Sequence, residues 1–374
     1  MRIGLDATPL LGPRTGIGRY TTELLRALAD GAEAAPGGPD QLVATAFTLR
    51  GAGDLGRVVP PGVTVRTRRA PARLLRELWR RWEVPPVSWA TGRLDLFHAT
   101  NFVLPPVGRA TGVVTVHDLS FLRVREAVDA ASLAYRELVP RSIARAEQVL
   151  TPSAAVAAEV VAEYGVDPAR VTPVHLGVDP AWSRARPDRD WARGRGLPED
   201  YVVAVGTLEP RKNLQVLVDA AAALLADDPG APDLVLVGPE GWGTRLDLGR
   251  FPPGRVHLTG FLDDGDLARV VAGSRALAFP SRYEGFGLPP VEALACGRPV
   301  VVSDLPVMRE VLGRHARYVP AEDTAAWSQA LADLPAADDP VAAAERRQHA
   351  AGYSWGACAR LTREVFTRAH RHAG

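Results

Sequence analysis

Lys212 is the residue whose type is most informative, because it is the only lysine in a chain that holds 44 lysines and arginines. A compact ammonium on a flexible stem suits a crowded anion site better than a planar guanidinium does. Arg211 and Lys212 stand between the apolar run at 204–206 and a helical pattern that begins at Leu214. In open α/β sheets, ligands bind at the carboxyl ends of strands, where such a turn lies. We therefore expect both cations to contact an anion; the alternative is a lysine left by chance in an arginine-biased composition.

Residues 279–297 hold a second group, in which a strand pattern ends in a glycine-rich loop and a proline pair opens a helix. Glu284 lies in the loop, Gly285 and Gly287 leave backbone N–H groups free to point outward, and Glu292 falls in the first turn of the expected helix. Two carboxylates beside such a loop would repel an anion unless they bind hydroxyl groups. Sugar and ribose hydroxyls meet that demand, whereas complementing the helix dipole is the alternative role for Glu292.

Glycines also mark the turn after the first strand pattern, in the segment Thr-Gly-Ile-Gly-Arg-Tyr at 15–20. The helical run Thr21–Leu28 follows, so the backbone N–H groups near Gly16 and Gly18 are placed to bind an anion at a helix N-terminus. A dinucleotide fingerprint needs a third glycine where this chain has Thr21, which disfavours nicotinamide binding. A plain turn is the alternative interpretation.

The rest of the chain predicts the scaffold that positions these residues. Short strand patterns alternate with longer segments of helical period, which is typical of parallel sheets covered by helices. The expected strands are Arg2–Ala7, Gln41–Thr48, Thr64–Arg66, Leu94–His98, Val113–His117, Gln148–Thr151 and Val171–Pro173, then Tyr201–Gly206, Asp233–Val237, Val256–Thr259, Ala276–Phe279, Pro299–Ser303 and Arg317–Val319.

We predict an α/β fold of two Rossmann-like domains, residues 1–180 and 190–355, with parallel sheets that face each other across a cleft. Polar residues at 182–190, with few aliphatic ones among them, are expected to connect the domains. A helical pattern from Trp355 to His370 predicts that residues 356–374 form a C-terminal helix that crosses back to the first domain.

Composition excludes several classes of protein. A formal net charge of +1 gives no overall basic character for binding nucleic acid. Cys296 and Cys358 are the only cysteines, too few for a disulfide framework or a thiolate metal site. The N-terminal residues show no apolar stretch typical of a signal peptide, and no later run reaches the roughly 18 apolar residues of a membrane span. We expect a cytoplasmic protein.

The motifs together resemble the retaining GT-B glycosyltransferases of family 4. The resemblance is carried by Glu284 and Glu292 around Glu-Gly-Phe-Gly-Leu-Pro, by Glu-Pro-Arg-Lys-Asn at 209–213 and by the glycine segment at 15–20. Similar stretches at 97–101, 116–119, 151–153, 176–179 and 300–303 extend it over nearly the whole chain.

The resemblance implies a role for each site residue. Arg211 and Lys212 would hold the diphosphate of a nucleotide-sugar donor, beside backbone amides of the Gly16–Gly18 loop. Glu284 would bind hydroxyl groups of the donor sugar, and Glu292 would bind the ribose. The remaining donor-binding residues of the motif are Gly285, Phe286, Gly287 and Leu288.

Two histidines end strand patterns of the first domain. The resemblance places His117 among the catalytic residues, near the sugar and phosphate; the alternative is a strand-end histidine that caps Asp118. His98 has the weaker claim and is expected in the core or in a loop.

Asp264-Gly265-Asp266 has the Asp-x-Asp form that binds divalent metal in other glycosyltransferases, but it precedes a helical pattern and suits a helix N-terminus. We therefore expect no metal site. Arg211, Lys212 and backbone dipoles would replace the cation in stabilising the leaving diphosphate.

The resemblance implies transfer of a hexose, with retention, from a nucleotide diphosphate sugar that is a substrate rather than a cofactor. GDP-mannose is the preferred donor, since two motifs resemble those of bacterial mannosyltransferases; a UDP- or dTDP-sugar stays open. Glycan, lipid-linked and small-molecule acceptors also stay open, as do front-face attack and double displacement. A sugar-nucleotide epimerase and a non-catalytic sugar-nucleotide-binding protein are the alternatives from other classes.

Residues 66–83 hold seven arginines and two glutamates. If 73–82 is helical, its apolar residues fall within an arc of about 140°, with Arg73, Arg76 and Arg80 opposite. Two interpretations stay open. The helix either rests on an anionic membrane, which would make the protein peripheral at the inner membrane face, or covers the core of the first domain and shows its charges to water.

Overall fold

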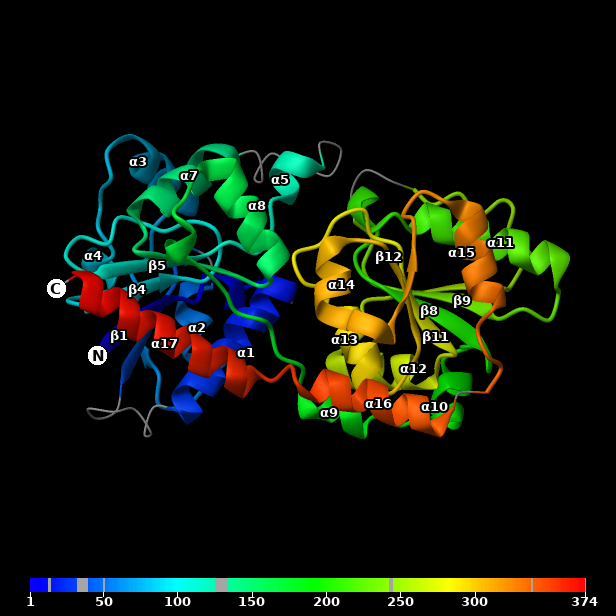
Figure 1. The fold of residues 1–374 in the computed structure, drawn as a ribbon. Helices are drawn as coiled ribbons and strands as arrows, with labels where there is room; N and C mark the ends of the chain where they lie inside the picture. The colour runs from blue at the N-terminus through cyan, green and yellow to red at the C-terminus, as the bar shows by residue number, and fades with distance from the viewer. Residues whose placement is uncertain are drawn as a thin grey trace. The chain divides into compact units, whose positions relative to one another are not determined.

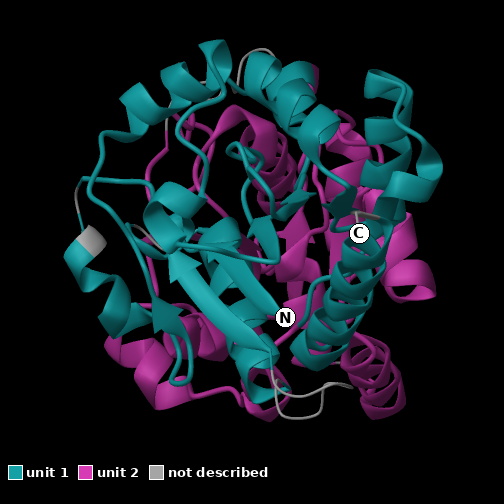
Figure 2. Cartoon of the chain, turned by 90° about the vertical axis from the view of Figure 1, so that its left-hand side faces the viewer, with its two compact units in different colours: residues 1–122, 129–177, 354–374 teal, residues 123–128, 178–353 magenta. Residues whose placement is uncertain are grey.

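The computed structural model describes residues 1–12, 15–31, 40–49, 51–124, 134–241, 245–337 and 339–373. The chain forms two compact units, each built around one parallel sheet (Figure 1, Figure 2). Unit 1 comprises Met1–Leu122, Asp129–Gly177 and Ser354–Gly374, and unit 2 comprises Arg123–Val128 and Val178–Tyr353.

Unit 1 has a seven-stranded sheet of order β3-β2-β1-β4-β5-β6-β7. Strands β4 and β5 are buried along their whole length, as expected for a parallel sheet covered on both faces. The strands are β1 (Arg2–Asp6), β2 (Gln41–Thr45), β3 (Thr64–Val65), β4 (Leu96–Ala99), β5 (Thr111–Thr115), β6 (Gln148–Thr151) and β7 (Val171–Pro173). The helices are α1 (Gly16–Asp30), α2 (Leu55–Val58), α3 (Ala72–Arg81), α4 (Ser88–Thr91), α7 (Tyr135–Arg145), α8 (Ala154–Tyr164) and α17 (Trp355–Ala373), together with α5 (Ser120–Arg123) up to Leu122.

Helices α1 and α17 lie side by side, although they are at opposite ends of the chain (Figure 1). Helix α1 begins where Thr15 accepts a hydrogen bond from the backbone N–H of Gly18, and it buries Tyr20, Leu24 and Leu28 at helical spacing. Among the described residues, no helix is both long enough and apolar enough to span a membrane.

Unit 2 has a six-stranded sheet of order β10-β9-β8-β11-β12-β13. Helices α11 and α15 pack together over it, with Trp327 fully buried in the apolar cluster between them. The strands are β8 (Tyr201–Val205), β9 (Asp233–Val237), β10 (Val256–Gly260), β11 (Ala276–Phe279), β12 (Val300–Ser303) and β13 (Arg317–Val319). The helices are α9 (Pro180–Arg184), α10 (Arg189–Gly194), α11 (Leu214–Asp227), α12 (Asp264–Gly273), α13 (Leu288–Ala295), α14 (Pro306–Leu312), α15 (Thr324–Ala332) and α16 (Pro340–Ala351).

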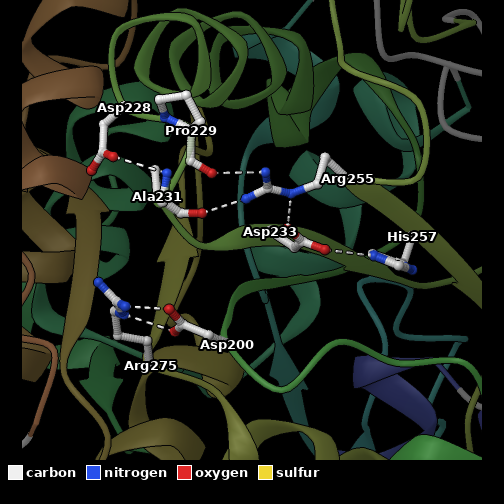
Figure 3. A network of polar contacts seen from close by, with 9 residues as sticks. Asp200, Asp228, Pro229, Ala231, Asp233, Arg255, His257 and Arg275 are labelled. Atoms are coloured by element: carbon white, nitrogen blue, oxygen red, sulfur yellow. Dashed lines mark hydrogen bonds and ion pairs between the residues drawn. The ribbon is translucent and has the colours of Figure 1, made fainter.

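Ion pairs connect neighbouring strands at the amino edge of the unit 2 sheet, where the strands begin (Figure 3). Asp233, at the start of β9, pairs with Arg255 and accepts a hydrogen bond of 3.0 Å from His257. Arg255 also donates to the carbonyl groups of Pro229 and Ala231. These contacts fix the strand starts, while the opposite, carboxyl edge carries the loops singled out by the sequence.

The α/β fold of two Rossmann-like units is confirmed, and every expected strand is present with ends that differ by a few residues. The stretch 182–190 differs from the prediction, because it contains all or part of two short helices, α9 and α10, that fold onto unit 2. Trp182 is only 2% exposed, and its carbonyl accepts a hydrogen bond from the Cys296 thiol. Burial of this one large side chain outweighs the polar composition around it.

Two of the changes of unit, after Gly177 and after Tyr353, fall in neighbouring segments of chain. The backbone N–H of Val178 donates to the carbonyl of Tyr353 at 3.1 Å. A Cβ atom at Gly177 would lie 2.1 Å from the backbone nitrogen of Trp355. The close approach of the two segments therefore requires glycine at 177.

Gly177→Ala is expected to lower the free energy of unfolding by about 3 kcal/mol or more, because the added methyl group meets backbone that cannot turn aside. Thermal unfolding measures the effect. Gly356→Ala is the matched control, since a Cβ there meets no heavy atom within 4 Å. Equal melting temperatures for the two variants would contradict the expectation.

Candidate active site

Arg211 and Lys212 lie in the turn after β8, at the carboxyl edge of the unit 2 sheet. Pro210–Lys212 form a short 3-10 helix, and Asn213 takes a left-handed conformation (φ 52°) before α11 begins. A Cβ atom at Gly206 would lie 3.2 Å from Lys212 Cε, and the φ of Gly206 is +152°. The glycine thus leaves room for the lysine stem to fold back over the strand end.

Both cations contact one carboxylate. Lys212 Nζ lies 2.7 Å from Glu284 Oε1, and Arg211 Nη1 lies 3.1 Å from the same oxygen. Lys212 Nζ is also 4.8 Å from the centre of the Phe279 ring. The three charged side chains are 9% to 18% exposed, so their contacts are largely shielded from water.

The order of the strands explains how a loop 72 residues away reaches Lys212. Strand β8 pairs with β11, and the strand order reverses between them. Ligands of open α/β sheets bind at such a switch point. The turn after β8 and the loop after β11 therefore meet at the place where this fold binds ligands.

Glu209 is a fourth charged residue beside Arg211, Lys212 and Glu284, and the sequence patterns did not assign it a role. Its Oε1 atom lies 2.7 Å from Arg211 Nη2, and its side chain is 8% exposed. Arg211 also donates to the carbonyl of Tyr283 at 3.0 Å. The signal available in the sequence was an acid two residues before an arginine in a tight turn. With two cations and two carboxylates, this charge cluster of Glu209, Arg211, Lys212 and Glu284 has no net charge.

Burial and charge shift the pKa values of the charge cluster in opposite directions. Burial raises the pKa of Glu284, but Arg211 and Lys212 lower it by more, so that it falls to about 2. Burial lowers the pKa of Lys212, against the raising effect of Glu284. Glu284 is therefore ionised at neutral pH and accepts hydrogen bonds without donating any.

The loop from Gly285 to Leu288 leads into α13. Gly287 has a φ of +89°, and a Cβ atom there would lie 2.4 Å from Met308 Cε, so only glycine fits. Phe286 is buried and makes an edge contact with Tyr353, with ring centres 5.8 Å apart. The Phe286 side chain therefore anchors the loop in the core of unit 2, whereas the backbone of the loop remains the part suited to a ligand.

Glu292 lies further along its helix than the sequence predicted, and its side chain is buried. Helix α13 begins at Leu288, so Glu292 falls in its second turn rather than its first, and it is 2% exposed. Burial raises the pKa of the nearby Cys296 thiol to about 12, and the Glu292 carboxylate adds to this rise. The alternative role of Glu292, to complement the helix dipole, is weak at this position, because that effect fades beyond the first turn.

His117 lies just beyond β5, at the carboxyl edge of the unit 1 sheet. Its Nε2 atom is 2.8 Å from the carbonyl of Thr100, which can only accept, so Nε2 carries the proton. Burial lowers the pKa of His117, against smaller raising effects of Thr100 and Asp118. The neutral ring then presents Nδ1 as an acceptor, which suits a hydroxyl group. Tyr20 and Phe102 hold the ring by edge contacts at 5.0 and 5.6 Å.

Gly16 and Gly18 lie inside α1 rather than before it, which corrects the expected helix start at Thr21. The backbone N–H of Gly18 donates to Thr15 Oγ1 at 3.2 Å, and is therefore already occupied. A Cβ atom at Gly18 would lie 2.9 Å from the carbonyl oxygen of Pro9, whereas one at Gly16 would meet nothing within 4 Å. Gly18 thus serves helix packing, and the first-turn amides near Gly16 are the ones suited to an anion.

His98 is a core residue. It is fully buried, and its Nε2 atom lies 2.8 Å from Thr115 Oγ1. Burial lowers its pKa to about 3, so it stays neutral.

The cap of α12 is Asp263, which accepts from the N–H of Asp266, while Asp264 and Asp266 lie in the first turn. Asp266 pairs with Arg195 and Arg269 at 2.7 and 2.9 Å. No cluster of three or more potential metal ligands occurs in the described part of the chain.

The structure thus brings Arg211, Lys212 and Glu284 into direct contact, with Glu292 on the helix that follows. Gly16 and His117 lie at the carboxyl edge of the other sheet.

The ionised form of Glu284 is expected to stabilise the fold above about pH 4.5, its unfolded pKa, and to lose this effect as pH falls toward its folded pKa of about 2. The melting temperature of Glu284→Gln should therefore lie well below that of the wild type near neutral pH, and the gap should narrow in acid. Glu322→Gln, which removes an exposed partner of Arg282, serves as control and should show a small gap throughout. A gap for Glu284→Gln that is independent of pH would contradict the assigned charge state.

Comparison with known proteins identifies the family. Residues 14–182 match the family described as Glycosyltransferase Family 4, and residues 199–336 match Glycosyl transferases group 1. An Escherichia coli protein named O-antigen chain mannosyltransferase B is 28% identical over 98% of this chain and 99% of its own length. A D-inositol 3-phosphate glycosyltransferase of Streptomyces scabiei is 32% identical over 76% of this chain and 71% of its own length.

Solved structures show the same fold. Sucrose-phosphate synthase from Thermosynechococcus elongatus aligns with a TM-score of 0.70 and 20% identity, over 98% of both chains. HepE from Anabaena, solved with UDP and glucose, aligns with a TM-score of 0.71 and 18% identity, over 98% of this chain and 99% of that one. With both sheets built as in these GT-B proteins and both halves matched, the chain belongs to the family 4, or group 1, glycosyltransferases.

Proposed function

We propose that this protein is a retaining hexosyltransferase that uses a nucleotide diphosphate sugar, with GDP-mannose as its donor. The observation that carries the proposal is the buried contact of Arg211 and Lys212 with Glu284 at the switch point of the unit 2 sheet. The mannosyltransferase name of the Escherichia coli relative supports the choice of sugar.

The charge cluster suits a donor that carries both a diphosphate and a sugar. Glu209 and Glu284 hold the two cations in position before any ligand arrives, so that little reorganisation is needed when charge develops on the leaving diphosphate. Glu284, with one oxygen on Lys212 and Arg211, would accept a hydrogen bond from a donor-sugar hydroxyl through the other. Glu292 would bind the ribose, and Gly285, Gly287 and Leu288 would offer backbone amides.

Unit 1 would contribute His117 and the first turn of α1. The Nδ1 atom of His117 accepts a hydrogen bond from a sugar hydroxyl, and amides near Gly16 bind a diphosphate oxygen. The acceptor attacks from the face that the diphosphate leaves, which gives retention. Because Arg211 and Lys212 supply the positive charge, the reaction needs no divalent metal.

Lys212→Ala is expected to reduce hexosyl transfer by on the order of 100-fold or more, as the loss of one preorganised charge stabiliser commonly does. Lys212→Arg should also lose activity, because we expect a planar guanidinium to fit this crowded turn less well than the compact ammonium does. A screen of nucleotide sugars by thermal stabilisation selects the donor, and product analysis measures transfer in buffer with excess EDTA.

Several outcomes would count against this proposal. Full activity of Lys212→Ala would remove Lys212 from the diphosphate site. Activity restored only by Mg²⁺ or Mn²⁺ would overturn metal independence. Donor consumption without any transfer product would favour an epimerase.

Helix α3 is the feature that bears on the acceptor. The predicted helix is confirmed, and it buries Leu75 and Trp79 against unit 1. Leu74 and Trp82 are 53% and 62% exposed, however, and Arg73 is exposed as well. Arg80, expected on the charged face, is instead held by Glu77 and Glu137. One face thus covers the core, while another leaves apolar and basic groups in water.

We propose that this exposed face rests on an anionic membrane and that the acceptor is lipid-linked. Exposed Val84 and Trp89 follow within the same segment, and Arg68 lies 5.1 Å from the centre of the Trp89 ring. Each basic residue near such a surface contributes about 1 kcal/mol, an effect that salt screens.

Cosedimentation with anionic vesicles is expected to be strong at low salt and weak at high salt for the wild type. The double variant Arg73→Glu, Trp82→Gln should lose most of the binding, whereas Arg26→Glu, an exposed reversal on α1, should keep it. Vesicle binding that does not depend on salt, or that persists in the double variant, would leave a soluble acceptor as the better proposal.

A further inference from the structure

Arg282 contacts the turn that carries Lys212, and the proposed donor site does not use it. It lies in the loop after β11. Its backbone N–H donates to the carbonyl of Arg211 at 2.9 Å, and its Nη1 atom donates to the carbonyl of Pro210 at 2.8 Å. Both carbonyl groups belong to the short 3-10 helix that ends at Lys212. Arg282 thus holds the backbone that carries both cations of the charge cluster.

Glu322 fixes the orientation of the Arg282 guanidinium group. Its two carboxylate oxygens accept from Arg282 Nε and Nη2 at 2.7 and 2.9 Å. Such a bidentate arginine–carboxylate pair adds geometric specificity, because both groups are planar. Glu322 lies in the loop after β13, where the carbonyl of Ala321 also accepts from Asn213 Nδ2 at 2.8 Å. The turn after β8 is therefore held from two loops, one after β11 and one after β13.

The exposure of this pair favours a role in geometry over a role in stability. The side chains of Arg282 and Glu322 are 39% and 65% exposed, and ion pairs in contact with water contribute little to folding. Three nitrogen atoms of Arg282 are nevertheless engaged, at 2.7 to 2.9 Å. A displacement of about 1 Å in a catalytic group can reduce a rate by roughly 100-fold. Contacts that barely stabilise the fold can therefore have a large effect on the reaction.

We propose that Arg282 is a positioning residue for hexosyl transfer and that Glu322 holds its guanidinium group in place. Arg282 does not touch the donor, and it acts through the backbone of the 3-10 helix on Lys212. With the turn held, the Lys212 ammonium stays on Glu284 and meets the leaving diphosphate without reorganisation. This inference rests on the proposed function, because it needs Lys212 to bind the diphosphate.

Turnover of a nucleotide sugar with water as the acceptor tests the proposal, measured as release of the nucleoside diphosphate at high enzyme concentration. The probes are GDP-mannose, UDP-glucose and dTDP-glucose, and the one that the wild type turns over fastest is used for the variants. Arg275→Gln is the matched control. Arg275 precedes β11 as Arg282 follows it, and it forms a bidentate pair with Asp200 at the opposite, amino edge of the sheet (Figure 3).

Arg282→Gln keeps the backbone N–H but removes the guanidinium group, so kcat should fall roughly 10- to 100-fold while the donor KM changes by less than about threefold. Arg282→Lys should not restore kcat, since one ammonium group lacks the fork that reaches Glu322 and Pro210 together. Glu322→Gln should lower kcat by a smaller factor, because Arg282 keeps its contact with Pro210. Melting temperatures of these variants should stay near the wild-type value, and Arg275→Gln should keep the wild-type kcat.

The double variant Lys212→Ala, Arg282→Gln distinguishes positioning from an independent role. If Arg282 acts through Lys212, its removal has less to disturb once Lys212 is gone. The loss of kcat caused by Arg282→Gln should therefore be several-fold smaller in the Lys212→Ala background than in the wild type.

Three results would overturn the positioning role. One is an unchanged kcat in Arg282→Gln. Another is an equal loss in Arg275→Gln, which would assign the effect to folding. The third is an equal loss from Arg282→Gln in both backgrounds, which would make Arg282 independent of Lys212. A wild type that turns over none of the three nucleotide sugars would instead refute the hexosyltransferase proposal itself, and the positioning role with it.

Discussion

The contact of Glu284 with Lys212 and Arg211 is the interaction on which the proposed donor site depends. It joins the turn after β8 to the loop after β11, and Glu209 balances the remaining positive charge. Removing one partner from such a buried network leaves an uncompensated charge, which typically costs about 3–5 kcal/mol. The same balance keeps two cations fixed at one place without a ligand, which is what stabilisation of a leaving diphosphate requires.

Parallel topology explains why the candidate site residues of each unit lie at the carboxyl edge of its sheet. In unit 2 the strand order reverses between β8 and β11, and in unit 1 between β1 and β4. The first switch point carries the charge cluster, and Gly16 and His117 lie at the carboxyl edge of the other sheet. The opposite edge of the unit 2 sheet is occupied by structural ion pairs, such as that of Asp233 with Arg255 (Figure 3). In unit 2, the charge cluster and the structural ion pairs thus lie at opposite ends of the strands.

Several residues that a motif joins together have different physical roles. Gly18 is required because α1 approaches Pro9, and Gly287 because α13 approaches Met308, whereas Gly16 meets no such constraint. Phe286 serves the core, although it lies within the loop assigned to the donor. The two arginines Arg76 and Arg80 share a face of α3, yet only Arg80 has carboxylate partners in the described chain. Position in a motif therefore does not by itself assign a contact.

The sequence by itself determined the alternation of strands and helices, the glycine turns and the position of Lys212 in a turn at the carboxyl end of a strand, because these depend on local periodicity, backbone freedom and residue type. Only the tertiary structure decided the rest. Pairing of β8 with β11 brought Glu284 to Lys212, and burial of Trp182 folded a polar stretch onto unit 2. Glu209 and Arg282 gained their places from contacts that no local pattern records. Long-range packing sets which charges meet and which stay unpaired, and a linear pattern carries little information about either.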